Sequence, residues 1–581
     1  MPVLAALLLA ALLALPLGAQ TLPTCTAAEY STCDLVFELA PGEKPDGVLL
    51  RLELRSPSKK TLLMPAFHDG GSRLVVRFGP NEAGEWDYKI TSSLPRLDNK
   101  EGKATATASE SPGFIRTANV HHFATERGNL DKSVKLPKPH LWMGAAIDMD
   151  EPRAAFDQEV AKRVAQKFTH LRGVITKAAP DHAYFSEIDD RVRAINAKGL
   201  CFDLVLRDLP AADKREAFMQ YLAARYSPMN ITWQGIEAFE NRADARVVMK
   251  DYGDLLKRFD PYQHPRSTMG GATSSSLTGD QWIGFFTYQS PDVALGAVEH
   301  QLYATPAVNA SQIADPVALR KALWNATMNG QYPSMTPLDD ETAKLFTNWF
   351  DIMSDTRHWE LEPHFDVDGA RAIGLEIPDE DRPEENEAEG IEYLVYIEKP
   401  AGPIEVGVRR HSYNVRWINP ATGEETRLKD WKGERFVAEV PDASHDWLLQ
   451  LSRDGKKEGM LRSYKFASTP PPVQEPELNS QKIPYDIAEP SGSAVSAATP
   501  LPFRSKIRRS TRATRRMLYF WSAEMVGGPQ GARILGSGPE GMFRIPREFT
   551  TKLPGVLTLR LSAINANGKV YVLDKVYRLL P

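Results

Sequence analysis

Residues Asn230–Asn241 read NITWQGIEAFEN, and this stretch decides the expected fold. It opens as an apolar strand and changes within a few residues to glycine, two carboxylates and an amide. In a (β/α)8 barrel the active-site groups sit at the carboxyl ends of the strands. A strand that ends by presenting Glu237 and Glu240 therefore predicts a barrel with functional carboxylates at its mouth.

The surrounding sequence supports this prediction, because apolar strands alternate with helical segments from residue 140 onward. The predicted strands are 140–148, 170–177, 201–208, the opening stretch, 264–271, 283–290, 305–311 and 331–337. The predicted helices are 152–168, 184–198, 213–226, 243–259, 293–303, 317–328 and 341–354. Eight alternations in about 220 residues match a TIM barrel, which we assign to 135–365. The first strand, HLWMGAAID, lacks the glycine fingerprint that a doubly wound dinucleotide-binding sheet requires.

The segments on either side of the barrel predict further domains, so that the fold class is multidomain, with a central TIM barrel flanked by β-sandwich domains. Residues 27–117 alternate apolar and polar positions between turn residues, which predicts an N-terminal β-sandwich. Residues 370–453 predict a second β-domain. Residues 466–500, rich in Pro, Ser and Glu, predict a linker. Residues 504–581 predict an immunoglobulin-like β-domain with a hairpin turn at Asn567-Gly568.

Composition and charge limit the classes of partner. The chain has 581 residues, of which 42% are hydrophobic and 25% charged, and its net charge is −5. These values give no reason to expect nucleic acid or an anionic membrane as a partner. The basic run RSKIRRSTRATRR at 504–516 reads as a solvated face, with a polyanion site as the alternative.

The first 20 residues, MPVLAALLLAALLALPLGAQ, are apolar and end in small residues. They predict a cleaved signal peptide and a secreted or periplasmic protein, with an uncleaved anchor as the alternative. No later stretch approaches the length of a membrane span. Cys25 and Cys33 lie close together after the cleavage site, where a disulfide can persist, whereas Cys201 reads as a core residue. No residue spacing indicates a metal site, and no cofactor is predicted.

Several segments resemble secreted bacterial glycoside hydrolases. RFGPNEAGEWDYKITSS at 77–93 resembles the β-sandwich domain of unknown function that precedes the barrel in many of them. NITWQGIEAFEN, DPYQHPRST (260–268), TYQS (287–290) and RKALWNATMNGQYPSM (320–335) together resemble the apiosidase-like barrels. The elements at 419–424 and 446–447 resemble a domain family named for collagen binding in a collagenase. That label does not identify a ligand.

The resemblance implies hydrolysis of a poly- or oligosaccharide by two carboxyl groups, one from strand four and one from strand seven. Glu237 is the expected acid/base, with Glu240 as the second choice; the alternative is that both are loop carboxylates paired with arginine. On strand seven, Pro306–Ser311 places Ser311 where the resemblance leads us to expect the nucleophilic Glu. A serine without a base cannot replace that carboxylate. Asp148 is the first substitute, in an inverting mechanism, ahead of Asp150, Asp208 and Asp292.

Other polar and aromatic residues near the strand ends are candidates for sugar binding. Trp142, Trp233 and Tyr288 offer stacking faces, although tryptophans of this kind are more often core residues. Hydrogen-bonding candidates are Arg172, Gln234, His264, Arg266, Gln289, Asn309 and Ser311. His264 has the alternative of satisfying a buried carbonyl, and the arginines that of structural pairing.

Two functions follow from these residues. The first is a secreted carbohydrate-active protein that cleaves O-glycosidic bonds with Glu237 as general acid/base. The second is a non-catalytic glycan-binding or scaffold protein, because Ser311 replaces the expected nucleophile. Whether the chain is an enzyme, which sugar it takes and its oligomeric state do not follow from the sequence. Collagen binding or proteolysis lacks a zinc motif or a nucleophile triad.

Overall fold

The computed structural model describes residues 22–127, 137–242, 244–378, 388–453, 473–528, 531–551 and 553–581. The expected signal peptide lies outside them. The chain forms two compact units, 1–110 and 111–581. Among the described residues, no helix combines the length and the apolar character that crossing a membrane would require.

The first unit is a two-sheet β-sandwich, as its alternating pattern predicts. One sheet has the order β1-β8-β7-β3-β4 and the other β2-β6-β5. Trp86 and Tyr88 alternate along β7 and are 2% and 1% exposed, so both belong to the core of the sandwich. The strands are β1 Thr26–Ala28, β2 Cys33–Glu38, β3 Leu50–Arg55, β4 Thr61–Pro65, β5 Phe67–His68, β6 Arg73–Phe78, β7 Gly84–Ser92 and β8 Glu101–Thr107.

A disulfide joins Cys25 to Cys33, as their position in the sequence suggests, while Cys201 is a buried free thiol. Replacing both bonded cysteines by serine is expected to lower the stability of this unit by about 2.5 kcal/mol, because the closed loop restricts the unfolded chain. Thermal unfolding with and without dithiothreitol measures this. The reductant should destabilise the wild type and leave the double variant unchanged; equal responses would contradict the prediction.

The N-terminal β-sandwich is predicted to extend to residue 117, but residues 111–117 belong to the second unit. There β9 Ile115–Ala118, β10 His122–Thr125 and β11 Lys138–Pro139 form a small antiparallel sheet. His140 N donates to Phe123 O at 2.9 Å, which continues this sheet toward the first α/β strand.

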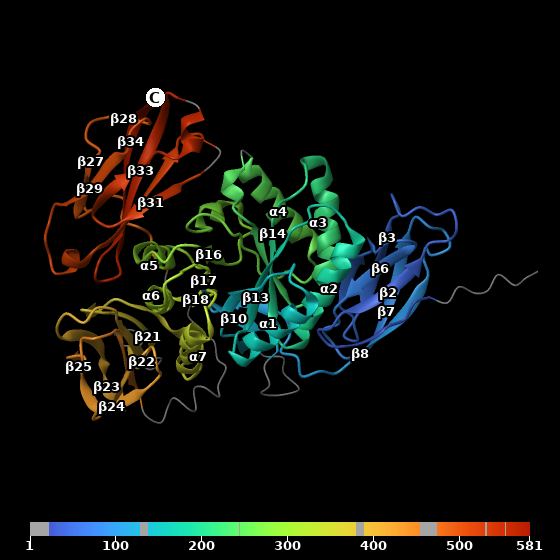
Figure 1. Cartoon of the computed structure of the whole chain (residues 1–581), viewed down its shortest axis with the longest axis horizontal. Coiled ribbons are helices and arrows are strands. Elements are labelled where there is room, and N and C mark those ends of the chain that lie inside the picture. Colours follow the sequence, from blue (N-terminus) through green and yellow to red (C-terminus); the bar gives the residue numbers. More distant parts are fainter. Residues whose placement is uncertain are drawn as a thin grey trace, which may run out of the picture. The chain divides into compact units, whose positions relative to one another are not determined.

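The α/β region has the predicted helices and two parallel sheets, β12-β13-β14-β15 and β16-β17-β18 (Figure 1). Its strands are β12 Gly144–Ala146, β13 His170–Ile175, β14 Cys201–Leu206, β15 Ile231–Ile236, β16 Phe286–Tyr288, β17 Ala307–Asn309 and β18 Gln331–Pro333. Its helices are α1 Arg153–Ala165, α2 His182–Ala197, α3 Ala212–Tyr226, α4 Ala245–Phe259, α5 Val293–Leu302, α6 Pro316–Met328 and α7 Asp340–Ser354, with 3-10 turns η1 Phe239–Asn241, η2 Ser275–Asp280 and η3 His358–Glu360.

The predicted fifth strand, 264–271, is the exception. It is reduced to a parallel bridge between Trp233 and Arg266, with Trp233 N donating to Pro265 O and Ser267 N donating to Trp233 O. Gly284 N donates to Arg266 O from the other side. Pro265 has no N–H to donate and Gly270-Gly271 disfavours extended structure, so a longer strand does not form. The short bridge nevertheless connects the two parallel sheets.

The next β-domain packs on the helices of the α/β region. Its strands have the order β19-β21-β22-β26-β23-β20, and β24 and β25 also pair with β23. Arg320 of α6 binds Asp446 through Nε at 3.0 Å, and Tyr396 donates to the same carboxylate at 2.9 Å. The strands are β19 Glu362–His364, β20 Val367–Asp368, β21 Arg371–Pro378, β22 Ala388–Ile397, β23 Ile404–Ile418, β24 Glu425–Arg427, β25 Trp431–Ala438 and β26 Trp447–Ser452.

The C-terminal domain is a second sandwich, with sheets β27-β29-β32 and β28-β34-β33-β30-β31. Gly568 has a φ of +75° in the predicted hairpin turn between β33 and β34. Its strands and turns are β27 Tyr485–Glu489, β28 Ala494–Ser496, β29 Leu501–Ile507, η5 Ala513–Arg516, β30 Leu518–Met525, β31 Arg533–Ser537, β32 Glu540–Phe543, η6 Arg547–Thr551, β33 Gly555–Ile564 and β34 Val570–Leu580.

The predicted linker needs correction where it is described, at 473–500. Tyr485–Glu489 and Ala494–Ser496 pair with strands of the C-terminal sandwich, because buried Tyr485, Ile487 and Val495 belong to its core. The polar composition of the segment concealed these few apolar residues.

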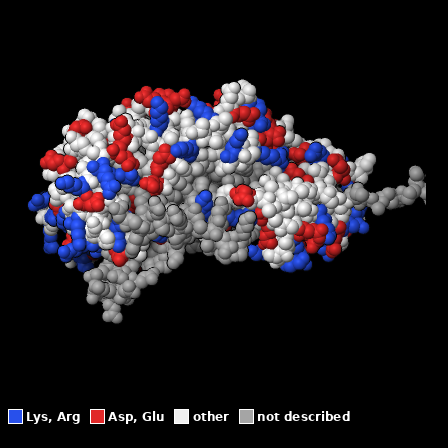
Figure 2. Space-filling model, turned by 90° about the horizontal axis from the view of Figure 1, so that it is seen from below, with Lys and Arg blue, Asp and Glu red and all other residues white. Residues whose placement is uncertain are grey.

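The basic run at 504–516 is partly neutralised by carboxylates. Four of its arginines have acidic partners: Arg504 with Glu489, Arg508 with Asp486, Arg512 with Glu405 and Arg516 with Asp368. On the face drawn in Figure 2, basic and acidic side chains are interspersed. The pairing favours the solvated-face reading over a polyanion site.

Candidate functional site

Glu237 lies directly after the carboxyl end of β15 and faces solvent. Its N–H donates to Leu206 O at 2.9 Å, and its side chain, 49% exposed, lies 3.5 Å from Arg207 Nε at the end of β14. The backbone conformation just before Glu237 requires glycine: Gly235 has a φ of +74°, and a Cβ at this position would lie 2.5 Å from Thr268 Cα. The carboxylate is exposed and lies beside an exposed arginine, as the alternative of a loop carboxylate paired with arginine expects, and it remains open to a ligand.

The other carboxylate candidates have different environments. Glu240 is half-buried in η1, and its carboxylate packs against Gly270 and Gly271. Asp148 is exposed and accepts a hydrogen bond from Asp150 N at 2.8 Å, which fixes the turn after β12. Their catalytic roles remain predictions.

The remaining candidate carboxylates have structural roles. Asp208 pairs with Arg242, which also binds Asp244 at 3.1 Å. Asp292 accepts from Leu295 N at 2.9 Å as the N-cap of α5, and burial raises its pKa.

Ser311 occupies the strand-seven position as a buried structural residue. It is 2% exposed, and its Oγ donates to Asn309 Oδ1 at 2.5 Å. Asn309 is equally buried and donates Nδ2 to Ser290 O at 3.1 Å and to Gln331 Oε1 at 2.9 Å. These polar atoms are used inside the protein, and the predicted sugar-binding roles of both residues stay predictions.

The three aromatic candidates are also buried. Trp142 stacks on His170 with ring centroids 3.6 Å apart, and Trp233 Nε1 donates to Asp260 Oδ2 at 3.0 Å. The Tyr288 hydroxyl donates to Glu299 at 2.5 Å, and burial together with this carboxylate raises the tyrosine pKa. All three side chains are at most 2% exposed, which favours the alternative core role, and their stacking on sugar stays a prediction.

Most of the hydrogen-bonding candidates are likewise buried in the interior. Arg172 donates Nη1 to Ser334 O and Oγ, both at 3.0 Å, and burial lowers its pKa. His264 Nδ1 lies 3.1 Å from Asp260 Oδ2. Gln234 is fully buried, and neither of its amide atoms has a hydrogen-bond partner among the described residues. All three side chains are buried, and their predicted contact with sugar stays a prediction.

Arg266 and Gln289 differ from that group. Arg266 is partly exposed and donates Nη1 to Gln263 Oε1 at 3.1 Å; burial lowers its pKa. Gln289 is exposed at the end of β16. Among the proposed hydrogen-bonding side chains at the described strand ends, Gln289 is therefore the most exposed one, and its sugar-binding role stays a prediction.

Two buried carboxylates that the sequence analysis did not single out organise this region. Asp260 accepts from Trp233 Nε1, Tyr262 N at 2.9 Å and His264 N at 2.9 Å. Glu299 accepts from Thr273, Ser275 and Tyr288. Asp260 follows a helix and stands directly before Pro261. Glu299 lies inside an apolar helix, and a carboxylate among apolar residues is the sequence signal for a buried hydrogen-bonding partner.

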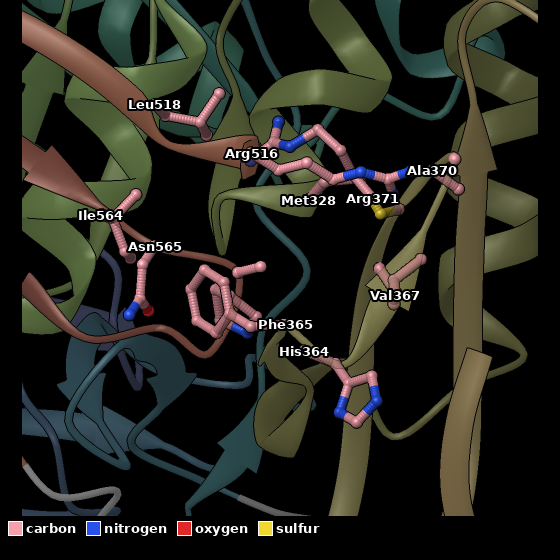
Figure 3. Close-up of a pocket in the computed structure, with 14 residues that line it drawn as sticks. Met328, His364, Phe365, Val367, Ala370, Arg371, Arg516, Leu518, Ile564 and Asn565 are labelled. Atoms are coloured by element: carbon pink, nitrogen blue, oxygen red, sulfur yellow. The ribbon is translucent and has the colours of Figure 1, made fainter. Parts of the chain in front are cut away.

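A separate cavity of about 350 Å³ lies between the β19–β21 segment and the C-terminal sandwich (Figure 3). Its wall is mostly apolar, with Met328, Phe365, Val367 and Ile564, and Arg371 and Arg516 contribute charge. The Arg371 guanidinium donates to Asn325 O at 3.1 Å and also binds Asn329 Oδ1, while Arg516 pairs with Asp368. The predicted sugar-binding residues do not line this cavity.

Comparisons with known proteins find one family model and several solved structures. Residues 26–93 match the family model described as a domain of unknown function (DUF5060). A putative glycoside hydrolase from Bacteroides vulgatus has a similar fold, with a TM-score of 0.60 and 16% identity, covering 74% of this chain and all of that one. A glycoside hydrolase family 5 structure from the same organism has a TM-score of 0.48 and 14% identity, covering 62% of this chain and 96% of that one. No curated protein matches the chain.

Proposed function

We propose that the chain is an exported, glycan-binding protein built on a glycoside hydrolase-like (β/α)8 barrel whose hydrolytic pair is incomplete. The fold shared with the putative glycoside hydrolase supports the barrel. So does the bridge at Arg266, which links β15 to the β16 segment. On the opposite edges, Arg172 of β13 and Ala146 of β12 bond Ser334 and Thr336 after β18. Together these contacts favour a ring of strands that closes on itself.

The proposed absence of hydrolytic activity rests on the hydrogen bond between Ser311 and Asn309. A retaining glycosidase needs a carboxylate about 5–5.5 Å from the acid/base, and an inverting one needs a second carboxylate farther away. At the strand-seven position the chain has a buried hydroxyl that is already hydrogen-bonded to its neighbour. It offers neither a charge nor access to a sugar carbon.

The remaining parts of the proposal concern location and accessory domains. The Cys25–Cys33 disulfide supports export to an oxidising compartment. The resemblance of the barrel to the apiosidase-like family favours a plant or microbial glycan as ligand. The Arg320–Asp446 contact supports a packing role for the domain that resembles the collagen-binding family.

A glycan panel tests the proposal, read by melting temperature and by release of reducing sugar. We expect a glycan to raise the melting temperature without release. Glu237→Gln should weaken that binding by about tenfold, the value of one charge-assisted hydrogen bond, and leave the unliganded stability within about 0.5 kcal/mol. Glu216→Gln is the matched control, an exposed glutamate paired with Arg258. Equal binding by both variants would contradict a ligand at Glu237.

A second candidate is inverting hydrolysis with Glu237 as acid and Asp148 as base, and the solvent-facing Glu237 favours it. Sugar release by the wild type that falls about a thousandfold or more in Glu237→Gln would establish it and reject the non-hydrolytic reading.

A further inference from the structure

We propose that His121, His300 and Glu362 bind a divalent transition-metal ion of the zinc class. One ligand atom from each residue lies within 4.8 Å of the other two. His121 comes from the β9–β10 turn, His300 from α5 and Glu362 from β19, so the cluster joins three segments that are distant in sequence. It borders Gly330, directly before β18, whereas Glu237 follows the carboxyl end of β15.

In its neutral form His121 directs a lone pair at the cluster. His121 Nε2 lies 2.9 Å from Tyr303 O, and a carbonyl can only accept, so Nε2 carries the proton. In a neutral ring Nδ1 is then an acceptor, yet it lies 3.1 Å from Glu362 Oε2, which is also an acceptor. A positive charge has to lie between them. A backbone carbonyl that holds the remote N–H is also the usual outer partner of a metal-bound histidine.

His300 supplies an independent observation. Its side chain is 6% exposed, and Nε2 lies 3.0 Å from Glu362 Oε2 without making a hydrogen bond to any residue that the structure describes. Its other nitrogen, Nδ1, accepts from Gln301 Nε2 at 3.4 Å, a long contact that an Nδ1 proton would displace when Nε2 binds an ion.

The spacing fits a tetrahedral ion. With metal–nitrogen and metal–oxygen bonds of about 2.0–2.1 Å, neighbouring ligand atoms are about 3.3 Å apart, close to the 3.0 and 3.1 Å found here. His122 Nε2 lies 3.3 Å from the other Glu362 oxygen, and Glu362 is 24% exposed, which provides a path for the ion. Imidazole and carboxylate ligands without a thiolate favour zinc over calcium or magnesium.

A second buried group, His170, Cys201 and Asp203, is less suited to a metal. Burial raises the pKa of the Cys201 thiol, which keeps it protonated. Asp203 Oδ1 is already used by His170 at 2.8 Å and by Thr232 at 2.7 Å. This group therefore serves as an internal control.

The test uses the full chain, stripped of metal with a chelator and dialysed against zinc chloride. Elemental analysis is expected to find about one zinc ion per chain, and zinc, but not magnesium, should raise the melting temperature. His300→Gln and Glu362→Gln should each weaken zinc binding by about a hundredfold or more. His411→Ala and Cys201→Ser are expected to retain it. Far-ultraviolet circular dichroism checks that each variant is folded.

The possible results distinguish a bound metal ion from an additional proton on His121. Zinc bound by the wild type and lost in both cluster variants supports the proposal. A wild type that takes up no zinc would show that a protonated His121 alone balances Glu362, and the proposal would be overturned. Zinc retained by both folded variants, or lost only in Cys201→Ser, would also overturn it. None of these results depends on glycan binding.

Discussion

Asp260→Ala is expected to lower the free energy of unfolding of the α/β region by about 3–5 kcal/mol. The carboxylate is fully buried and accepts hydrogen bonds from the Trp233 indole and from the backbone N–H groups of Tyr262 and His264. Alanine would remove this shared acceptor from three buried donors. Urea unfolding followed by helical ellipticity measures the loss, because all the α-helices of the described residues lie between 153 and 354.

The pH dependence provides a second measurement on Asp260. Burial alone would raise its pKa, but the charge and hydrogen bonds of His264 and the Trp233 bond outweigh burial and hold the pKa below 3.8. The ionised form therefore stabilises the fold above the ordinary pKa, and this contribution is lost as pH falls through the lowered value. Asp260→Asn should lack this acid-dependent loss. A variant with wild-type stability and the same acid profile would contradict the assigned role.

Asp189→Ala is expected to destabilise the same region by about 3–5 kcal/mol, because it leaves a buried guanidinium without its carboxylate. Arg225 Nε donates to Asp189 Oδ1 at 2.9 Å, and the two side chains are 1% and 3% exposed. The Tyr221 hydroxyl, 3.0 Å from Arg225 Nη1, carries no charge to replace the carboxylate.

Asp157→Ala is the matched control for Asp189→Ala. Arg153 Nε and Asp157 Oδ1 are also 2.9 Å apart, but their side chains are 48% and 49% exposed. Water and salt screen this pair, so its loss should change the stability by about 0.3–0.5 kcal/mol. Similar effects of the two substitutions would show that burial does not decide the value of these ion pairs.

For residues at the strand ends, the sequence does not predict which side chains face the interior. Trp233 and Tyr288 follow the same alternation as surface residues of a barrel mouth, and their sequence neighbours do not reveal their direction. Their partners lie elsewhere: Trp233 bonds Asp260 after α4, and Tyr288 bonds Glu299 inside α5. A one-residue change of register reverses the side on which such a side chain lies, and only the packed helices fix that register.

The sequence by itself determined most of the succession of helices and strands, since hydrophobic periodicity depends only on neighbouring residues; the exceptions are the strand expected at 264–271 and the strands inside the expected linker. The helix predicted at 213–226 is observed as Ala212–Tyr226, and the turn at Asn567-Gly568 is where it was expected. It also determined that strand seven carries Ser311 in place of a carboxylate.

Only the tertiary structure decided which polar side chains remain open to solvent, as Glu237 does, and which are used inside, as Ser311 and Arg172 are. The same is true of the meeting of His121, His300 and Glu362, which the sequence separates widely. The physical reason is that a buried polar group needs a partner, and that partner is supplied by whichever element the fold brings beside it.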